Sequence, residues 1–205
     1  MHPKTLFAAL SLLLAPVQGI VVPRDLGDGF FTGIVNSTGG ITWTKEGDLP
    51  AALQRRVDAG EFKASQTRPN CTDTYLPTNS SLTPTPGLSK RDEVGCTGRR
   101  VLWGHTDIYE SFKAIVYQRR CSTFAYQSRT IFTMTLGDWF WYGCNYQSGL
   151  YYCNPQDVEI AYVSVKYRCG DEGTGWDHLD VPNFTSGIEQ LGYGVCAGLE
   201  IWPGP

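Results

Sequence analysis

The cysteines constrain what this chain can fold into more than any other feature. Six of the seven lie in residues 92–205, after the dibasic pair Lys90–Arg91: Cys96, Cys121, Cys144, Cys153, Cys169 and Cys196. Removing residues 1–91 would also remove Cys71 and leave an even number. Six cysteines in 114 residues are typical of a small domain held by three disulfides, and their spacing leaves the pairing open. The gaps between them contain no Cys-x2-Cys pair, so no metal site is predicted.

The N-terminus has the pattern of a secretory signal peptide over residues 1–19. Lys4 supplies the positive charge, residues 6–15 form an apolar run, and Val17 and Gly19 are small enough for the −3 and −1 positions of a cleavage site. A membrane span needs about 20 apolar residues, so this run is too short to be a stable membrane anchor. We therefore expect a secreted, extracellular protein with oxidised cysteines.

The pair Lys90–Arg91 is the predicted processing site. It closes residues 65–90, in which 14 of 26 residues are Ser, Thr or Pro. Such a composition does not bury enough apolar surface to order itself and suits a protease cleft. A kexin-type protease is therefore the expected partner in maturation, separating a propeptide, residues 20–91, from a mature cysteine-rich domain, residues 92–205. The alternative is a dibasic pair in a linker between two retained regions.

Asn-x-Ser/Thr sequons support passage through the secretory route and predict glycosylation. They occur at Asn36, Asn70, Asn79 and Asn183. Three of the four precede Arg91, so a glycoprotein precursor would lose most of its glycans with the propeptide.

Hydrophobic periodicity predicts an α+β fold around one antiparallel sheet with one main helix. Expected strands are 29–35 and 41–44, which form a hairpin in the pro-region, and 100–103, 124–127, 130–135, 139–142, 158–167 and 195–202. Expected helices are 49–57, the main helix 107–120 and a short helix 186–191. The hairpin of the pro-region could pair with the mature domain as a chaperone or inhibitor, or act only as a spacer.

The net charge argues against nucleic-acid partners. Residues 92–205 hold eight Lys and Arg against 13 Asp and Glu, a net charge of −5. Proteins that bind nucleic acids usually carry a basic surface, because phosphate neutralisation supplies much of their affinity.

Candidate catalytic residues are His105 and His178, each with acids nearby, Asp177 among them. A histidine with a carboxylate can act as a general acid–base pair in hydrolysis. Neither histidine lies in a recognised catalytic motif, so the sequence assigns no catalytic residue and favours a protein that is not an enzyme. No cofactor is expected. The acidic segment 171–180 lacks the spacing of a calcium loop. A carbohydrate-binding face is an alternative, built from the outward half of a set of aromatic residues: Trp139, Trp141, Tyr142, Tyr146, Tyr151 and Tyr152.

The layout of signal peptide, Lys90–Arg91 and six following cysteines resembles fungal small secreted cysteine-rich proteins, a group that includes plant-pathogen effectors and kexin-processed killer toxins. The predicted element order is also similar to the split β-α-β sandwich of some killer toxins, although the strands around Cys144 and Cys153 depart from it. The resemblance implies an effector or toxin that binds a host or competitor protein, or a cell-wall glycan. It assigns no functional residue. The alternatives are a secreted hydrolase or nuclease using His105 or His178, or a carbohydrate-binding surface protein.

Overall fold

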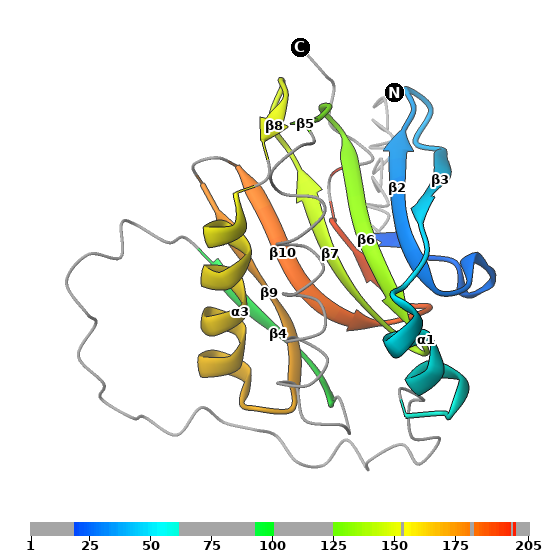
Figure 1. The fold of residues 1–205 in the computed structure, drawn as a ribbon. Helices are drawn as coiled ribbons and strands as arrows, with labels where there is room; N and C mark the ends of the chain where they lie inside the picture. The colour runs from blue at the N-terminus through cyan, green and yellow to red at the C-terminus, as the bar shows by residue number, and fades with distance from the viewer. Residues whose placement is uncertain are drawn as a thin grey trace, which may run out of the picture.

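Seven strands form one antiparallel sheet in the order β3–β2–β6–β7–β10–β9–β4 (Figure 1). The computed structural model describes residues 19–61, 93–100, 125–152, 154–180, 183–197 and 199. The strands of this sheet are β2 (Gly29–Val35), β3 (Ile41–Gly47), β4 (Glu93–Arg100), β6 (Thr130–Leu136), β7 (Trp139–Asn145), β9 (Gly173–Leu179) and β10 (Phe184–Gln190). Short pairs β1 (Ile20–Val21) with β11 (Gly194–Val195), and β5 (Ala125–Tyr126) with β8 (Tyr151–Tyr152), lie beside it. The predicted α+β class is confirmed.

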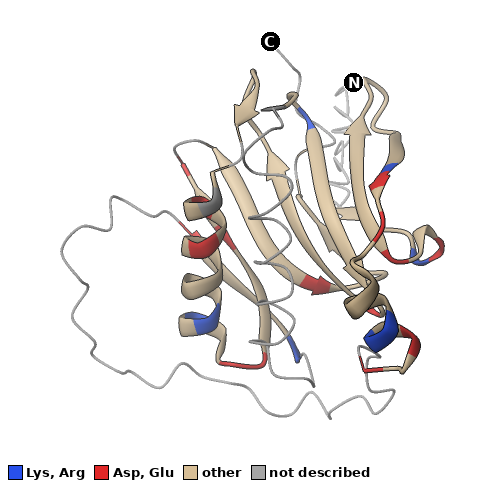
Figure 2. Ribbon diagram, viewed as in Figure 1, with Lys and Arg blue, Asp and Glu red and all other residues tan. Residues whose placement is uncertain are grey.

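The two faces of the sheet have different covers. Helices α1 (Ala51–Asp58) and α3 (Pro155–Cys169) pack on one face, called here the helix face (Figure 1). The opposite or outer face packs against the segments around β1, the 3-10 turn η1 (Arg24–Leu26) and β11. Figure 2 shows charged residues mainly on the helices and turns, with few along β6 and β7. Both faces of the sheet therefore carry apolar core.

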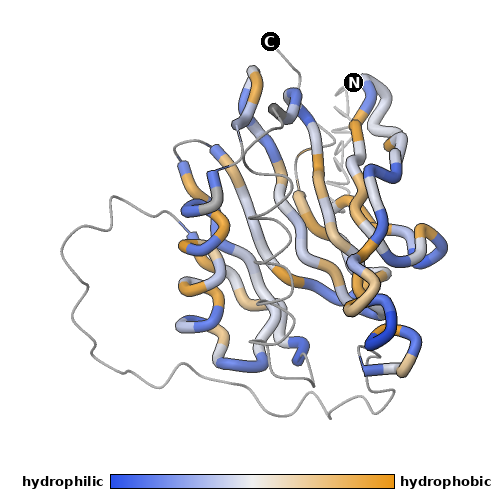
Figure 3. The backbone as a smooth tube through the Cα atoms, viewed as in Figure 1, coloured by the Kyte–Doolittle hydropathy of each residue, from blue (hydrophilic) through white to orange (hydrophobic). Residues whose placement is uncertain are grey.

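The middle strands lack the alternation of a half-exposed sheet. Every residue of β6 and β7 is buried, and hydrophobic residues also recur along α3 (Figure 3). On the helix face the rings of Phe132 and Phe184 lie 5.8 Å apart and nearly parallel. They close over Gly143, where a Cβ atom would lie 2.4 Å from Phe132 and 2.8 Å from Phe184.

The predictions of strands at 130–135 and 139–142 are confirmed, as are the 29–35/41–44 hairpin and the helix at 49–57.

The predicted strand over 158–167 is wrong, because this segment forms α3. Asn154 caps the helix by accepting a hydrogen bond from the Gln156 amide at 3.0 Å, and a proline suits the first turn that follows. Val158 and Val165 are buried on one side of the helix, whereas Val163 on the other side is exposed. The β-branched content suggested a strand, but the cap and the packing of one helical side decide the structure.

The predicted short helix over 186–191 is also wrong. This segment belongs to β10, which pairs with β7 on one side and β9 on the other. Gly187 fits because a Cβ atom there would lie 2.3 Å from the Gly175 carbonyl oxygen and 2.8 Å from the Tyr142 hydroxyl. Close packing in the middle of the sheet thus requires a glycine at this position.

Other predicted elements differ in extent. Of the last strand, expected over 195–202, β11 (Gly194–Val195) contains only the first residue; the described residues 196, 197 and 199 are not in a strand, and 198 and 200–202 lie outside the described residues. The strand expected at 100–103 begins earlier, at Glu93, and residues 101–103 lie outside the described residues. The strand expected at 124–127 is the short β5. The main helix predicted over 107–120 lies outside the described residues as well.

Residues from the predicted propeptide are part of the same sheet as the cysteine-rich region. β2 lies between β3 and β6, and six residue pairs join Gly29–Ile34 of β2 to Thr130–Thr135 of β6. Ile20, which would follow the predicted signal cleavage, begins β1 and pairs with Val195. The processing boundary at Lys90–Arg91 stays a prediction, but the hairpin is an integral part of the core.

Among the described residues, two disulfides are present, Cys96–Cys169 and Cys144–Cys196. The first joins the edge strand β4 to the end of α3, and the second joins β7 to the segment after β11. Cys121 and Cys153 lie outside the described residues. No helix within the described part of the chain is long and apolar enough to cross a membrane.

Candidate functional site

His178 lies on the outer face of β9, among polar groups of neighbouring elements. Its Nδ1 is 2.7 Å from the Thr185 hydroxyl, and its Nε2 is 3.7 Å from an Asp180 carboxylate oxygen. The ring of Tyr146 meets the imidazole edge-on, with centroids 5.9 Å apart. A hydroxyl, an imidazole and a carboxylate in series have the residue types of a nucleophile, a base and an orienting acid.

The surroundings of Thr185 do not suit a nucleophile. Its side chain is buried, and it pairs with Cys144 on β7 and His178 on β9, so it lies in the middle of the sheet. Backbone amides of an interior strand are used in bonds to the neighbouring strands, so β10 offers Thr185 no free amide to stabilise an oxyanion. Asp180 is exposed and beyond hydrogen-bond distance of the ring. This geometry orients His178 but does not build a hydrolytic centre around it.

Asp177, the acid proposed from the sequence as a partner of His178, lies on the other face of the sheet. Adjacent residues of a strand point to opposite sides. Asp177 is opposite Ser186 and fully buried on the helix face, whereas His178 is opposite Thr185 on the outer face. The structure therefore does not bring Asp177 and His178 together. His105 lies outside the described residues.

Most of the aromatic residues proposed as a sugar-binding face belong to the core. Trp139, Trp141, Tyr142 and Tyr151 are all buried. Only two of the six reach solvent: Tyr146 is half-buried, and Tyr152 is 71% exposed at the short β5–β8 pair. The outward part of this set therefore consists of Tyr146 and Tyr152, fewer than the expected half.

A different group of aromatic side chains lies on the outer face over β10, β9 and β4. It consists of Tyr146, Trp176 and Tyr193 with Arg99, and we call it the outer-face band. The Trp176 indole covers the Gly95 backbone, since a Cβ atom at Gly95 would lie 2.3–2.5 Å from three indole atoms. His178 and Trp176 are two residues apart on β9, so they point to the same face. Within the band, Arg99 lies on β4 and Trp176 on β9, while Tyr146 follows β7 and Tyr193 follows β10.

Arg99 forms the charged end of the outer-face band. Its Nε and Nη2 donate to the two carboxylate oxygens of buried Glu189 at 2.6 and 2.5 Å. The guanidinium lies 3.8 Å from the centre of the Tyr193 ring. Burial lowers the pKa of Arg99, but the hydrogen bond and charge of Glu189 outweigh it and the net shift of the pKa is upward. Arg99 stays charged and is held in one orientation.

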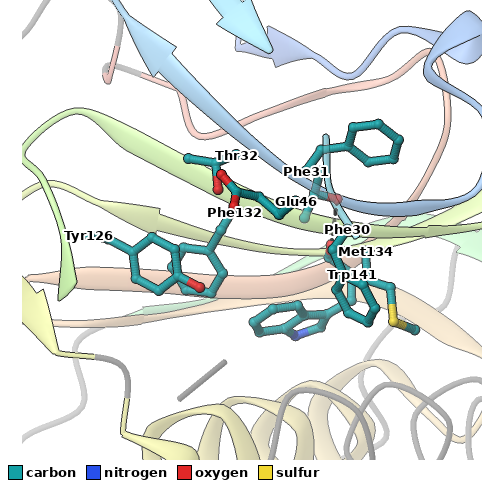
Figure 4. A pocket seen from close by; sticks show the side chains of 9 residues that line it. Phe30, Phe31, Thr32, Glu46, Tyr126, Phe132, Met134 and Trp141 are labelled. Carbon is teal, nitrogen blue, oxygen red and sulfur yellow. Dashed lines mark hydrogen bonds between the residues drawn. The ribbon is translucent and has the colours of Figure 1, made fainter. Parts of the chain in front are cut away.

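A small hollow lies between β2, β6 and the start of the β5–β8 pair (Figure 4). Aromatic side chains dominate its wall, and the stacked rings of Tyr126 and Phe132 lie 4.1 Å apart. Glu46 is the one charged side chain among its described lining residues. A single carboxylate beside core aromatics provides few polar groups to orient a small ligand.

Segment 171–180, considered above for calcium, is mainly the strand β9 rather than a loop. Among the described ranges, no three His, Cys, Asp or Glu side chains converge as metal ligands.

Of the predicted glycosylation sites, Asn36 lies exposed in the turn between β2 and β3, and Asn183 is half-buried with its amide 3.4 Å from the Tyr146 carbonyl. Asn70 and Asn79 lie outside the described residues.

The outer-face band was not anticipated from the sequence. The one usable signal was the alternation in Gly-Thr-Gly-Trp-Asp-His-Leu, which would place Trp176 and His178 on one face of a strand. Arg99 and Tyr193 join them only through tertiary contacts.

Comparison with protein-family models, curated proteins and solved structures finds no match for this chain.

Proposed function

We propose that this chain is a secreted binding protein of effector or toxin type, matured by kexin-type cleavage, that engages an extracellular or host protein through the outer-face band. The observation that supports this proposal is the gathering of Tyr146, Trp176, Tyr193 and Arg99 on one face. Tyr, Trp and Arg are the residues most enriched in binding hot spots. They are also held in place: Trp176 rests on Gly95, and Arg99 is fixed by Glu189.

Exposure of the band fits a contact surface. Tyr193 is 40% exposed, and Tyr146 and Trp176 are partly accessible. Aromatic rings fixed by their own packing lose little conformational entropy when a partner covers them. The two disulfides of the described region and the predicted export signal suit a protein that acts outside the cell.

The test compares aromatic residues on the two sides of the molecule. Labelled secreted protein is measured for binding to intact yeast cells and plant protoplasts by flow cytometry. Tyr193→Ala and Trp176→Ala should weaken binding about tenfold or more, the scale of a hot-spot truncation. Tyr167→Ala is the matched control, because Tyr167 is exposed on α3 at the opposite face. Equal loss from Tyr167→Ala and Tyr193→Ala, with circular dichroism unchanged, would contradict the proposal.

The second candidate is a hydrolase that uses His178 or His105, and the observation behind it is the contact of His178 with Thr185 and Asp180. Removing a general acid–base group typically lowers a rate about 10²- to 10⁴-fold. If the protein acts by binding, His178→Ala combined with His105→Ala should leave toxicity or binding within a few-fold. A loss of about a hundred-fold in that folded double variant, with Tyr193→Ala still active, would favour the hydrolase. Binding to a glycan array that Trp176→Ala abolishes would favour the carbohydrate alternative.

A further inference from the structure

We infer that residues 20–61 remain bound to the cysteine-rich region after cleavage at Lys90–Arg91, so that the processed protein has two chains. The inference rests on the processing step of the proposed function. Hydrolysis would add one water across the Arg91–Asp92 peptide bond, leaving a carboxylate on Arg91 and an amino group on Asp92. The contacts that argue for retention are all made by residues outside 62–92.

The first argument is the position of β2. It pairs with β3 on one side and with β6 on the other, so it is an interior strand of the seven-stranded sheet. Six residue pairs join it to β6, and the Val35 amide extends the ladder to the Arg129 carbonyl at 3.1 Å. Loss of β2 and β3 would turn β6, which is buried along its whole length, into an edge strand with unpaired backbone groups.

The second argument is the apolar surface that residues 20–61 share with the remainder. On the helix face, Phe30 and Leu49 belong to the same buried cluster as Phe132 and Trp141. On the outer face, Ile20 is among the residues buried with β7 and with the segment around β11. A core divided between two chains in this way has the character of an obligate interface.

The third argument is a set of polar contacts made by residues 24–28, the segment that precedes β2. The Arg24 guanidinium donates to the Leu191 carbonyl at 3.1 Å. The Thr135 hydroxyl donates to the Gly27 carbonyl at 2.5 Å. The Gly137 backbone amide donates to the Asp28 carboxylate at 2.7 Å. These contacts fix the register of β2 on β6, so residues 20–61 occupy one defined place.

The experiment tests whether residues 20–61 stay bound to the cysteine-rich region, and it does so independently of natural cleavage at Lys90–Arg91 and of target binding. Residues 64–69 of the full chain are replaced by the recognition site of a sequence-specific protease, and the purified protein is cut in vitro. The released N-terminal piece then lacks cysteine, because Cys71 is the first in the chain. The two pieces should co-elute in size-exclusion chromatography at low micromolar concentration. They should separate only in denaturant.

A matched pair of variants tests whether β2 is responsible. Phe30→Ala, at a buried position, should raise the dissociation constant of the cut pieces at least about tenfold, whereas Ile34→Ala, at an exposed position of the same strand, should change it less than about threefold. The uncut variants serve as folding controls, because the intact chain supplies a high effective concentration. Separation of the cut wild-type pieces, whether the C-terminal piece stays folded or aggregates, would overturn the inference.

Discussion

Arg99 on the edge strand β4 pairs with Glu189 on β10, although β9 lies between these two strands. The bidentate contact connects β4 and β10 across β9. Glu189 is 1% exposed, so its charge depends on Arg99 for compensation, while Arg99 itself is 27% exposed. The pair therefore fixes both the edge of the sheet and the orientation of the outer-face band.

Replacing Arg99 should destabilise the fold through the charge that it leaves behind. Breaking a buried pair by removing one partner costs about 3 kcal/mol or more, because the other charge stays buried. We expect Arg99→Met to lower the free energy of unfolding in urea by about 3 kcal/mol, and Arg99→Met with Glu189→Leu to lower it by less. Lys45→Ala, which removes the exposed pair with Asp48, should change it by no more than about 0.5 kcal/mol. Equal effects of Arg99→Met and Lys45→Ala would contradict this account.

Two asparagines should respond differently to the same substitution. Buried Asn145 donates from its amide nitrogen to the carbonyls of Tyr126, Gln127 and Gly149 at 2.8–3.2 Å. Asn145→Asp would replace that donor with a carboxylate facing carbonyl oxygens, so a loss of about 3 kcal/mol is expected.

Asn154 is the control, because it caps α3 through its side-chain oxygen. Asp caps helices about as well as Asn, and Asn154→Asp should stay within about 1 kcal/mol of wild type. Thermal unfolding followed by circular dichroism measures both variants. A larger loss from Asn154→Asp than from Asn145→Asp would refute the prediction.

Gly143 should not tolerate a methyl group. The Cβ of Gly143→Ala would press on Phe132 and Phe184, whose rings are confined by Tyr126 and Tyr151. Overpacking of this kind costs about 1–3 kcal/mol and should reduce the near-ultraviolet circular dichroism of the stacked rings. Gly149→Ala is the matched control, since nothing lies within 4 Å of its Cβ position. Similar stability of the two variants would argue against the packing seen around Gly143.

Two tyrosines should ionise late in alkaline titration. Burial raises the pKa of the Tyr142 phenol well above 10, with the charge of Glu189 adding to it. Burial raises the pKa of Tyr151 as well, followed by the charge of Asp157. Above about pH 10 the unfolded chain loses these protons while the folded chain keeps them, so stability should fall as pH rises from about 10.

Absorbance at 295 nm measures this ionisation. At about pH 11 the folded protein should show fewer phenolates than the protein in guanidinium chloride. Tyr142→Phe should reduce the number of late-ionising groups by one. Complete, reversible ionisation of the folded protein by about pH 10.5 would show that neither phenol is protected.

Local sequence signals predicted much of the sheet. The strands of the β2–β3 hairpin and β6 and β7 follow from β-branched and aromatic runs separated by turn residues, and these were found where expected. The same signals misassigned α3 and β10. In α3 the helix is set by the Asn154 cap and one buried side, with Val163 facing solvent, while in β10 polar and glycine residues are accommodated by the strands on either side.

The candidate site depended on information that a single sequence does not carry. Asp177 and His178 are adjacent in the chain, yet strand geometry places them on opposite faces, so proximity in the sequence does not bring these two side chains together. Arg99, Trp176 and Tyr193 come from three separate segments and lie on the same face because β4 and β10 flank β9. No local pattern relates these residues to one another.

By itself, the sequence determined the α+β class, the even set of cysteines after Lys90–Arg91 and the strands β2, β3, β6 and β7, because composition, turn residues and side-chain alternation act over a few residues. Only the tertiary structure decided that residues 20–61 complete the sheet, that α3 is a helix, and that the aromatic band lies on the outer face. Strand order, face and burial arise from contacts between residues far apart in the chain, and those contacts outweigh local propensity.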